Sequence, residues 1–448
     1  MKNDNMRIRK KLHWAVFVFL AFILFPSLGK AEDEVLTLDL AIQMALTRNE
    51  QALTADQQVD VASAQVVRAR AFFLPNITGT GTYTRRPFQV FRTIGSQQIA
   101  VQKYNAIAGA IALNLTIFDS QSIPALMQAR SGRVAQQYAS LESKRKLAFE
   151  VSNAFLSSLS VTQVLEAAKR RADFAKQALE AAKARYSAGL VSVHDVTRAE
   201  LEYVTAQAAI IQAKGQADTT LIQLGNLLAD TSTARKTLKS PDFLLQAAEE
   251  KQIEEGSLIA EGQNRRLDLN SLRWYAKGQR ALLIAPTLKW FPSLALTGRY
   301  AYTNESGLTG RPTNWNAGLT LTWNLFDAFN RNADYIEQRA LTNIADLNVK
   351  AALRQVDLDV RDALVSLANQ RDSLKQAMIA DEVAKRNAAE ITELYRQGLS
   401  TALEVADANV SLFEAEVELV TARYGLGIAY LNLEAALGLD PFGKEPQL

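Results

Sequence analysis

One segment of the chain is written twice, and this repetition constrains the fold more than any other feature. Residues 185–200 read RYSAGLVSVHDVTRAE and residues 394–409 read LYRQGLSTALEVADAN, with Tyr, Gly-Leu and acid-Val at matching positions. Two more pairs keep the same order, LPNITGTGTY with FPSLALTGRY, and Phe118-Asp119 with Phe326-Asp327. The chain is therefore a tandem repeat. We place the first repeat at residues 32–229, a linker at 230–264, the second repeat at 265–438 and a C-terminal tail at 439–448.

The first 31 residues differ from the rest. Several Lys and Arg residues precede an apolar run from Trp14 to Phe25, and small residues follow at Gly29 and Ala31. This layout is typical of a secretory signal peptide. A transmembrane anchor is the alternative, but the run is shorter than the roughly 20 residues that cross a bilayer. We expect residues 1–31 to be removed on export. Because the chain has no cysteine, the exported protein folds without disulfides.

Charge and composition exclude several classes of function. Six of the 50 basic residues and one of the 47 acidic residues lie before position 32, which leaves 44 basic against 46 acidic residues. The basic excess therefore belongs to the signal and indicates no nucleic-acid partner. After the signal the chain contains one histidine, His194, and no cysteine. Cys/His nucleophile pairs and multi-histidine metal sites are therefore absent from the sequence. We expect no enzyme, no cofactor and no metal; an unusual carboxylate hydrolase is the enzymatic alternative.

Each repeat contains two segments that alternate between apolar and polar residues, as strands do. They lie at about 77–85 and 104–118 in the first repeat, and at about 294–303 and 315–326 in the second. The polar face is small and rich in hydroxyls, and Trp315 and Trp323 mark the last strand near its two ends. A sheet that covers a soluble core is one interpretation. Export, strand length and the tryptophans favour a membrane β-barrel with an aromatic girdle.

Four strands cannot close a barrel, and open strand edges are not tolerated in lipid. Several copies of the chain must therefore contribute strands. Two copies would give a barrel of eight strands, whose interior is filled by side chains. Three copies would give twelve strands and leave a lumen. A homotrimer is the smallest assembly that we expect to conduct.

Long helices follow the strands. The 70 positions from Asp119 to Gly189 and the 71 from Asp327 to Gly398 contain only one proline, Pro124, near the start. Each segment would extend about 105 Å as a helix. After the two Gly-Leu turns, small and apolar residues recur with 3-4 spacing, which predicts a coiled-coil seam. The seam comprises Val196, Ala199, Tyr203, Ala206, Ile210 and Ala213 in the first repeat, and Val405, Ala408, Leu412, Ala415, Leu419 and Ala422 in the second.

The repeated segments are therefore hairpin tips, at residues 188–192 and 397–401. A glycine allows the chain to reverse, and an acid or hydroxyl caps the returning helix. A purely structural turn and a contact with a partner are both consistent with the two glycines.

Taken together, these motifs resemble the outer membrane efflux protein family, the TolC-like exit ducts of Gram-negative envelopes. The resemblance covers nearly all of the chain after the signal. It implies an α+β membrane protein with four transmembrane strands per chain, a trimeric 12-stranded barrel and a long α-helical coiled-coil barrel that extends into the periplasm. It also implies an equatorial band midway along the helices, formed by the linker and the tail.

The resemblance implies partners as well. The tips would meet a periplasmic membrane-fusion adaptor, which connects to an inner-membrane pump of RND, ABC or MFS type. The residues placed at this contact are Gly189, Leu190, Ser192, Gly398, Leu399 and Thr401. The strands would meet outer membrane lipid. The basic loop at about 85–104 could touch anionic headgroups, or its charges could simply be solvated.

Gate residues follow from the same resemblance. Glu404 and Asp407 fall where the family places acids around the periplasmic constriction. Gathered from three copies, these carboxylates would attract cations, and mutual repulsion would raise the proton affinity of some of them. The alternative for these two residues is an exposed pair of helical acids without a gating role.

The resemblance also implies a latch. Asp195 and Tyr395 match positions that link neighbouring helices and hold the aperture closed. His194 and Ser400 stand where the family has Thr and Arg for a second link. We therefore expect a closed state that is weaker here, or sensitive to protonation of His194.

The sequence thus predicts a passive exit duct of a tripartite efflux or type I secretion system. An exported coiled-coil fibre or adhesin with a β-strand anchor is the alternative. The pump determines the cargo, so the sequence does not specify it.

Overall fold

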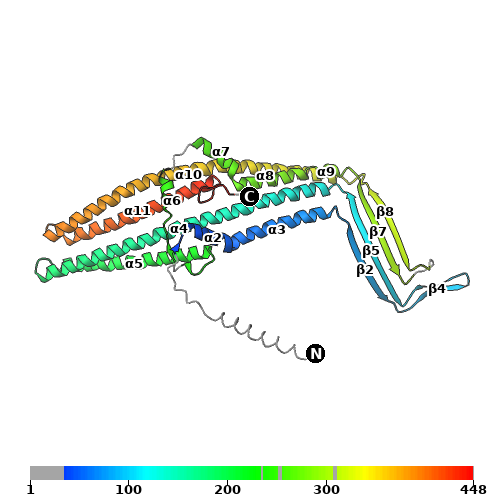
Figure 1. Ribbon diagram of the computed structural model, residues 1–448, viewed down its shortest axis with the longest axis horizontal. Coiled ribbons are helices and arrows are strands. Elements are labelled where there is room, and N and C mark those ends of the chain that lie inside the picture. Colours follow the sequence, from blue (N-terminus) through cyan, green and yellow to red (C-terminus); the bar gives the residue numbers. More distant parts are fainter. Residues whose placement is uncertain (1–34, 234–235, 251–254, 306–309, 447–448) are drawn as a thin grey trace, which may run out of the picture.

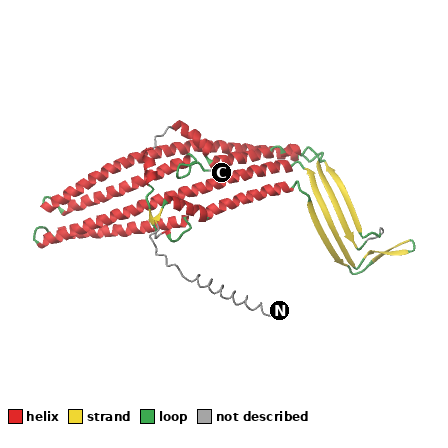
Figure 2. Ribbon diagram, in the orientation of Figure 1, coloured by secondary structure: helices red, strands yellow, loops and turns green. Residues whose placement is uncertain are grey.

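The computed structural model describes residues 35–233, 236–250, 255–305 and 310–446. The predicted signal peptide lies outside these residues. A β-sheet forms one end of an elongated molecule, and two helical hairpins form the other (Figures 1 and 2). Within the described residues, no helix combines the length and apolar character needed to cross a bilayer.

The sheet has four antiparallel strands in the order β2 (Asn76–Arg85), β5 (Asn105–Phe118), β7 (Ser293–Thr303) and β8 (Thr313–Thr322). The β5–β7 pairing joins the two repeats, with Ile111 opposite Tyr300. A small hairpin, β3 (Val90–Ile94) and β4 (Gln97–Gln102), lies between β2 and β5 in the chain. Strands β2 and β8 are the edges, and no further described strand pairs with either.

The register separates two chemical faces. Residues directly opposite each other in a ladder share a face. One face pairs Leu296 with Leu319 and Tyr300 with Trp315, while the other pairs Arg299 with Asn316. The apolar face is uncovered, because Trp315 is 74% exposed and Leu319 is 62% exposed. In the described part of the chain no helix packs across this sheet. The soluble-core interpretation of the strands is therefore wrong.

Strand β8 is shorter than predicted. It ends at Thr322, which pairs with Ser293, the first residue of β7. Because β7 offers no partner beyond that point, Trp323 and the residues up to 326 lie outside the strand.

Two very long helices leave the sheet, α4 (Ser122–Ser187) with 66 residues and α10 (Asn330–Gln397) with 68. Each extends about 100 Å. The returning helices α5 (Val193–Leu227) and α11 (Ala402–Ala436) have 35 residues each. Nearer the sheet, α3 (Glu50–Ala71) packs on α4, and α8 (Leu267–Leu282) packs on both α4 and α10. The helix α2 (Leu38–Arg48) precedes α3, and the short helix α9 (Ala285–Leu288) follows α8.

The predicted seam packs as a coiled coil. Ala206 is fully buried against Ala172 and Ala175 of α4. In the second repeat, Ala408 and Leu412 are buried against Ala388 of α10. The small alanine side chains allow the two helices of each hairpin to approach closely.

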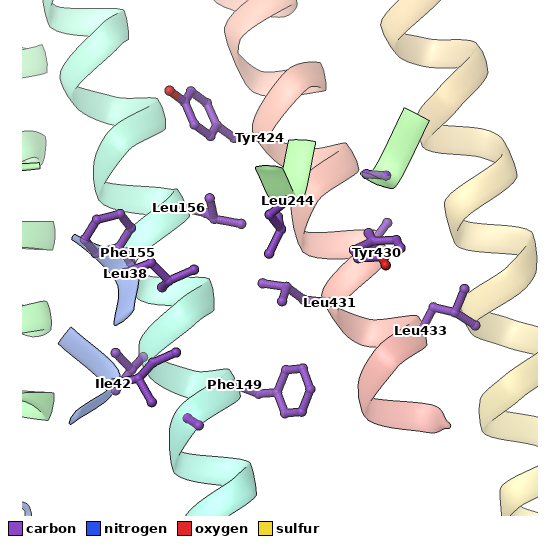
Figure 3. Close-up of a cluster of buried hydrophobic side chains, with 14 of the residues drawn as sticks. Leu38, Ile42, Phe149, Phe155, Leu156, Leu244, Tyr424, Tyr430, Leu431 and Leu433 are labelled. Atoms are coloured by element: carbon purple, nitrogen blue, oxygen red, sulfur yellow. The ribbon is translucent and has the colours of Figure 1, made fainter. Parts of the chain in front are cut away.

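The main hydrophobic core lies midway along the helices (Figure 3), where Leu156 of α4 and Leu431 of α11 meet Leu244. Leu244 belongs to α6 (Asp242–Glu250), which lies within the predicted linker together with β6 (Thr237–Leu238). The helix α7 (Glu255–Arg265) also lies there except for its last residue. Strand β6 pairs in parallel with β1 (Val35–Leu36). Phe243 stacks on Phe442 with ring centroids 5.9 Å apart, so the linker and the tail meet at this level.

Candidate functional site at the helical tips

Each hairpin reverses at a glycine in the left-handed conformation. The φ angle is +72° at Gly189 and +81° at Gly398. The Leu399 amide donates to the Leu394 carbonyl at 2.9 Å, and the Leu190 amide donates to the Arg185 carbonyl at 3.0 Å. These bonds close the ends of α4 and α10 in the usual glycine C-cap geometry. Leu190 is 69% exposed and Leu399 is 73% exposed, so the turns present apolar side chains at the end of the molecule.

A capping box starts each returning helix. The Asp195 carboxylate accepts from the Ser192 amide at 3.0 Å, and the Asp195 amide donates to the Ser192 hydroxyl at 3.3 Å. Glu404 and Thr401 form the same pair of bonds, at 2.8 and 3.3 Å. Four residues that the sequence assigned to the gate or to partner contact therefore have a local structural role as well.

Nearby hydrogen-bond donors hold the Glu404 carboxylate in its charged form within one chain. The pKa of Glu404 lies below its usual value because the Ser400 hydroxyl donates to its carboxylate at 2.6 Å, followed by the amide and hydroxyl of Thr401. Within one chain these donors stabilise the charged form of Glu404. The rise in proton affinity that we expect from carboxylates gathered from three copies stays a prediction about the assembly. Asp407 lies one turn further along α11 and is exposed.

The implied Asp195–Tyr395 bond is not made within one chain. Asp195 faces back to its own helix start, where it accepts from the Ser192 amide and hydroxyl. Tyr395 is buried, and its hydroxyl has no hydrogen-bond partner among the described residues. Tyr395 lines a cavity of about 20 Å³ between the two hairpins, together with Glu202 and Asn409. A cavity of that size holds about one water molecule.

The second link is also absent between the described residues. His194 is exposed near the start of α5, and Ser400 donates to Glu404 instead. The departure from the family pattern at these two positions therefore leaves no pairing between them.

An arginine that the sequence analysis missed joins the hairpins. Arg185, in the last turn of α4, donates from Nη1 to the carbonyl of Tyr395 in the last turn of α10. Its guanidinium carbon lies 4.7 Å from the centroid of the Tyr395 ring. The last carbonyls of a helix lack partners within the helix and carry partial negative charge, so a cation is favourable there. The sequence contained one signal for this residue. In the repeat alignment Arg185 falls opposite Leu394, so the charge is present in only one of the two repeats.

Two further arginines of α4 hold the hairpins together above the tips. Arg170 forms an ion pair with Glu416 of α11 at 2.9 Å. Arg171 forms an ion pair with Glu202 of α5 at 2.8 Å, and its guanidinium carbon lies 5.1 Å from the ring centroid of Phe413 on α11. The Arg170–Glu416 and Arg171–Phe413 contacts would have to break if the hairpins moved apart, whereas the Arg171–Glu202 pair lies within the first hairpin.

The predicted girdle residues lie at opposite ends of the sheet. Trp315 is opposite Tyr300 on the apolar face. Trp323 lies just beyond β8, where its ring N–H donates to the Trp290 carbonyl at 3.1 Å. The guanidinium of Arg331 lies 4.0 Å from the Trp290 ring centroid. This junction also carries the exposed Phe326 of the repeated Phe-Asp pair, and two exposed aromatic residues that the sequence analysis did not single out, Phe291 and Phe329.

No group of three or more His, Cys, Asp or Glu side chains within the described ranges is placed to hold a metal ion. The tips instead combine exposed acids, exposed leucines and inter-helix contacts. This arrangement is suited to conformational change and to contact with a partner.

The family model described as outer membrane efflux protein matches residues 41–230 and 258–439. The chain belongs to this family. The outer membrane protein TolC of Escherichia coli (strain K12) is 22% identical over 440 residues, which cover 94% of this chain and 85% of TolC. Nodulation protein T of Rhizobium leguminosarum bv. trifolii is 22% identical over 428 residues, which cover 90% of this chain and 86% of that protein. The solved Campylobacter jejuni CmeC outer membrane channel has the same fold, with a TM-score of 0.76 and 18% identity over 92% of this chain and 87% of that chain.

Membership of the family confirms several predictions made from the sequence. The fold class is that of a TolC-like channel, and the function is that of an efflux exit duct rather than a fibre. The location is the outer membrane of a Gram-negative cell, with a periplasmic extension.

Proposed function

We propose that three copies of this chain close into one duct that passively carries solute from an inner-membrane pump to the outside. The observation that carries this proposal is the isolated four-stranded sheet, with an exposed apolar face and two unpaired described edges, β2 and β8. Neither edge is tolerated in lipid unless another strand covers it. Pairing β8 of one copy with β2 of the next removes both edges, and three copies leave room for a lumen.

The tips are the proposed contact with a periplasmic adaptor. Leu190 and Leu399 extend from turns that glycines and capping boxes hold in place, so two exposed apolar residues occupy defined positions on each chain. Gly189, Ser192, Gly398 and Thr401 act there by shaping the turns. The pump behind the adaptor, whether of RND, ABC or MFS type, supplies the energy, and no catalytic step occurs in the duct.

The proposed gate consists of Glu404 and Asp407. Both side chains are exposed on the first turns of α11 and lie three residues apart, hence on one face of the helix. In a trimer this face would turn toward the shared axis and make the narrow end attractive to cations. Opening would separate the hairpins that Arg185, Arg170 and Arg171 now connect.

The test uses full-length protein extracted in detergent and then inserted into planar bilayers. We expect the mass of a trimer and stable single-channel currents. Asp407→Ala should lower the preference for cations, whereas Glu382→Ala, which removes an acid that is exposed on α10 away from the tip, should leave it unchanged. A monomer that is soluble without detergent, or a trimer without conductance, would refute the duct. Unchanged ion preference in Asp407→Ala would remove that residue from the gate.

A further inference from the structure

The charges of the sheet are all of one sign. The strands β2, β5, β7 and β8 contain two arginines, Arg85 and Arg299, and no lysine, aspartate or glutamate. Arg85 lies on the apolar face, where it donates to the Asn105 side chain at 2.6 Å and its guanidinium carbon lies 5.4 Å from the Tyr104 ring centroid. Arg299 is therefore the one charged residue of these strands on the polar face.

Small uncharged residues surround Arg299. Its direct neighbours across the ladders are Ala112 on β5 and Asn316 on β8. The side chain is exposed, and in the described part of the chain it forms no ion pair. A single arginine on an ordinary exposed surface is hydrated, and its charge contributes little to stability. Arg299 instead lies within a wall of alanine, threonine and asparagine that leaves its guanidinium accessible.

A second arginine faces the same space. Arg311 and Arg299 line one hollow of about 500 Å³ on the polar face, beside Thr80, Thr82 and Asn314. The nearest acid in sequence, Glu305, is already engaged, because Arg86 forms an ion pair with it and the Lys103 amide donates to it at 2.6 Å. The hollow thus carries two guanidinium groups without a counter-charge among the described residues.

We propose that Arg299 and Arg311 form an anion-binding ring inside the outer part of the duct, which recognises carboxylate or phosphate groups of solutes as they leave. The inference rests on the proposed trimer, in which the polar face turns inward and three copies bring six guanidinium groups around one lumen. Guanidinium matches the geometry of carboxylates and phosphates, and a narrow passage with protein walls concentrates its field. The ring has the opposite sign to the acids Glu404 and Asp407 at the other end. Anionic groups are accordingly held near the exit and not at the periplasmic entrance.

Sided block of single-channel current tests this ring. Full-length trimer is inserted into a zwitterionic phosphatidylcholine bilayer, and inorganic triphosphate is added either to the barrel side or to the tip side. We expect block at lower concentration from the barrel side. The double variant Arg299→Ala, Arg311→Ala should raise the half-blocking concentration at least tenfold, and Arg299→Lys should raise it less because the positive charge remains. Arg85→Ala, which removes the same charge from the other face of the sheet, should leave the block unchanged.

The outcomes separate this inference from the proposed duct. If all variants conduct and the double variant is blocked as readily as the unsubstituted protein, the ring is refuted and the duct stands. Equal effects of Arg85→Ala and of the double variant would also refute it, because the binding would then not be on the inner face. If the unsubstituted trimer carries no current, the duct and the ring both fail.

Discussion

Replacing Arg185 with alanine should favour the open tip. The substitution removes the guanidinium that donates to the Tyr395 carbonyl and stacks on the Tyr395 ring, with 4.7 Å between the guanidinium carbon and the ring centroid. A hydrogen bond from a charged donor contributes about 1.5 to 3 kcal/mol, and an exposed cation–π contact about 0.5 to 1 kcal/mol. Arg185 is only half-buried, so solvent screening reduces the total, and we take about 1 to 2 kcal/mol per chain. This corresponds to a shift of about 5- to 30-fold in a two-state equilibrium.

Single-channel recording measures this shift as open probability at fixed voltage and salt. Arg185→Ala should raise the open probability, and Arg185→Lys should raise it less, because lysine keeps the charge at the end of α10 but loses the planar fork. Lys183→Ala is the matched control, since it removes an exposed positive charge two residues earlier on the same helix. The reasoning is refuted if Arg185→Ala and Lys183→Ala behave alike.

Tyr395→Phe then distinguishes the observed contact from the implied latch. The hydroxyl of Tyr395 is buried and has no hydrogen-bond partner in the described part of the chain, while the ring and carbonyl that Arg185 contacts are unchanged by this substitution. We expect little change in open probability. Opening as strong as that of Arg185→Ala would mean that the hydroxyl finds Asp195 in the assembled closed state.

Three further predictions concern the local structure. Glu404→Gln should preserve the start of α11, because glutamine can replace glutamate in a capping box, while Glu404→Ala should lower the protection of the first-turn amides against exchange. Since the pKa of Glu404 is lowered, its contribution is complete above pH 4.5 and declines as pH falls through the lowered pKa, so the protection factors of that turn should fall only in acid. Gly398→Ala and Gly189→Ala should each lower stability by about 1 to 2 kcal/mol in thermal unfolding, because both glycines have positive φ. Arg145→Ala should destabilise the equatorial region by about 3 to 5 kcal/mol, because it leaves the buried Glu142, now 2.8 Å from Arg145, with only the exposed Lys146 at 3.9 Å. Adding Glu142→Gln should restore part of the melting temperature.

Periodic features could be predicted from the sequence, because they depend on the chain's own repeat. Alternation predicted which residues share a face of the sheet, and the 3-4 spacing of Ala199, Tyr203 and Ala206 predicted the seam of the hairpin. Local chemistry also explains why the implied Asp195–Tyr395 bond is not made within one chain. Asp195 lies three residues after Ser192, so the nearby cap amide and hydroxyl compete for its carboxylate.

Contacts between the two repeats could not be predicted in the same way. The β5–β7 pairing and the Arg185–Tyr395 contact join residues about two hundred positions apart. Neither contact leaves a periodic signal in the sequence. The extent of β8 is a related case, since the starting point of β7 determines where its pairing ends.

The two tips are not equivalent in charge, although their backbones are closely alike. In the repeat alignment Asp407 falls opposite Arg198, and both side chains are exposed. Six hairpins closed into a ring would alternate between first and second repeats, so each acidic second tip would lie between two first tips that carry Arg185 and Arg198. Attraction between unlike neighbours would then favour closure, and mutual repulsion of the acids would oppose it.

Charge exchange at these positions tests that balance. Asp407→Arg alone and Arg198→Asp alone should each raise the open probability, because each places like charges beside one another. The double exchange should restore closure in part, and the restoration should weaken as ionic strength rises, because exposed charges are screened over about 10 Å at 0.1 M salt. If the double variant opens as much as the sum of the single variants, the two positions do not interact and closure depends on the Arg185 contact instead.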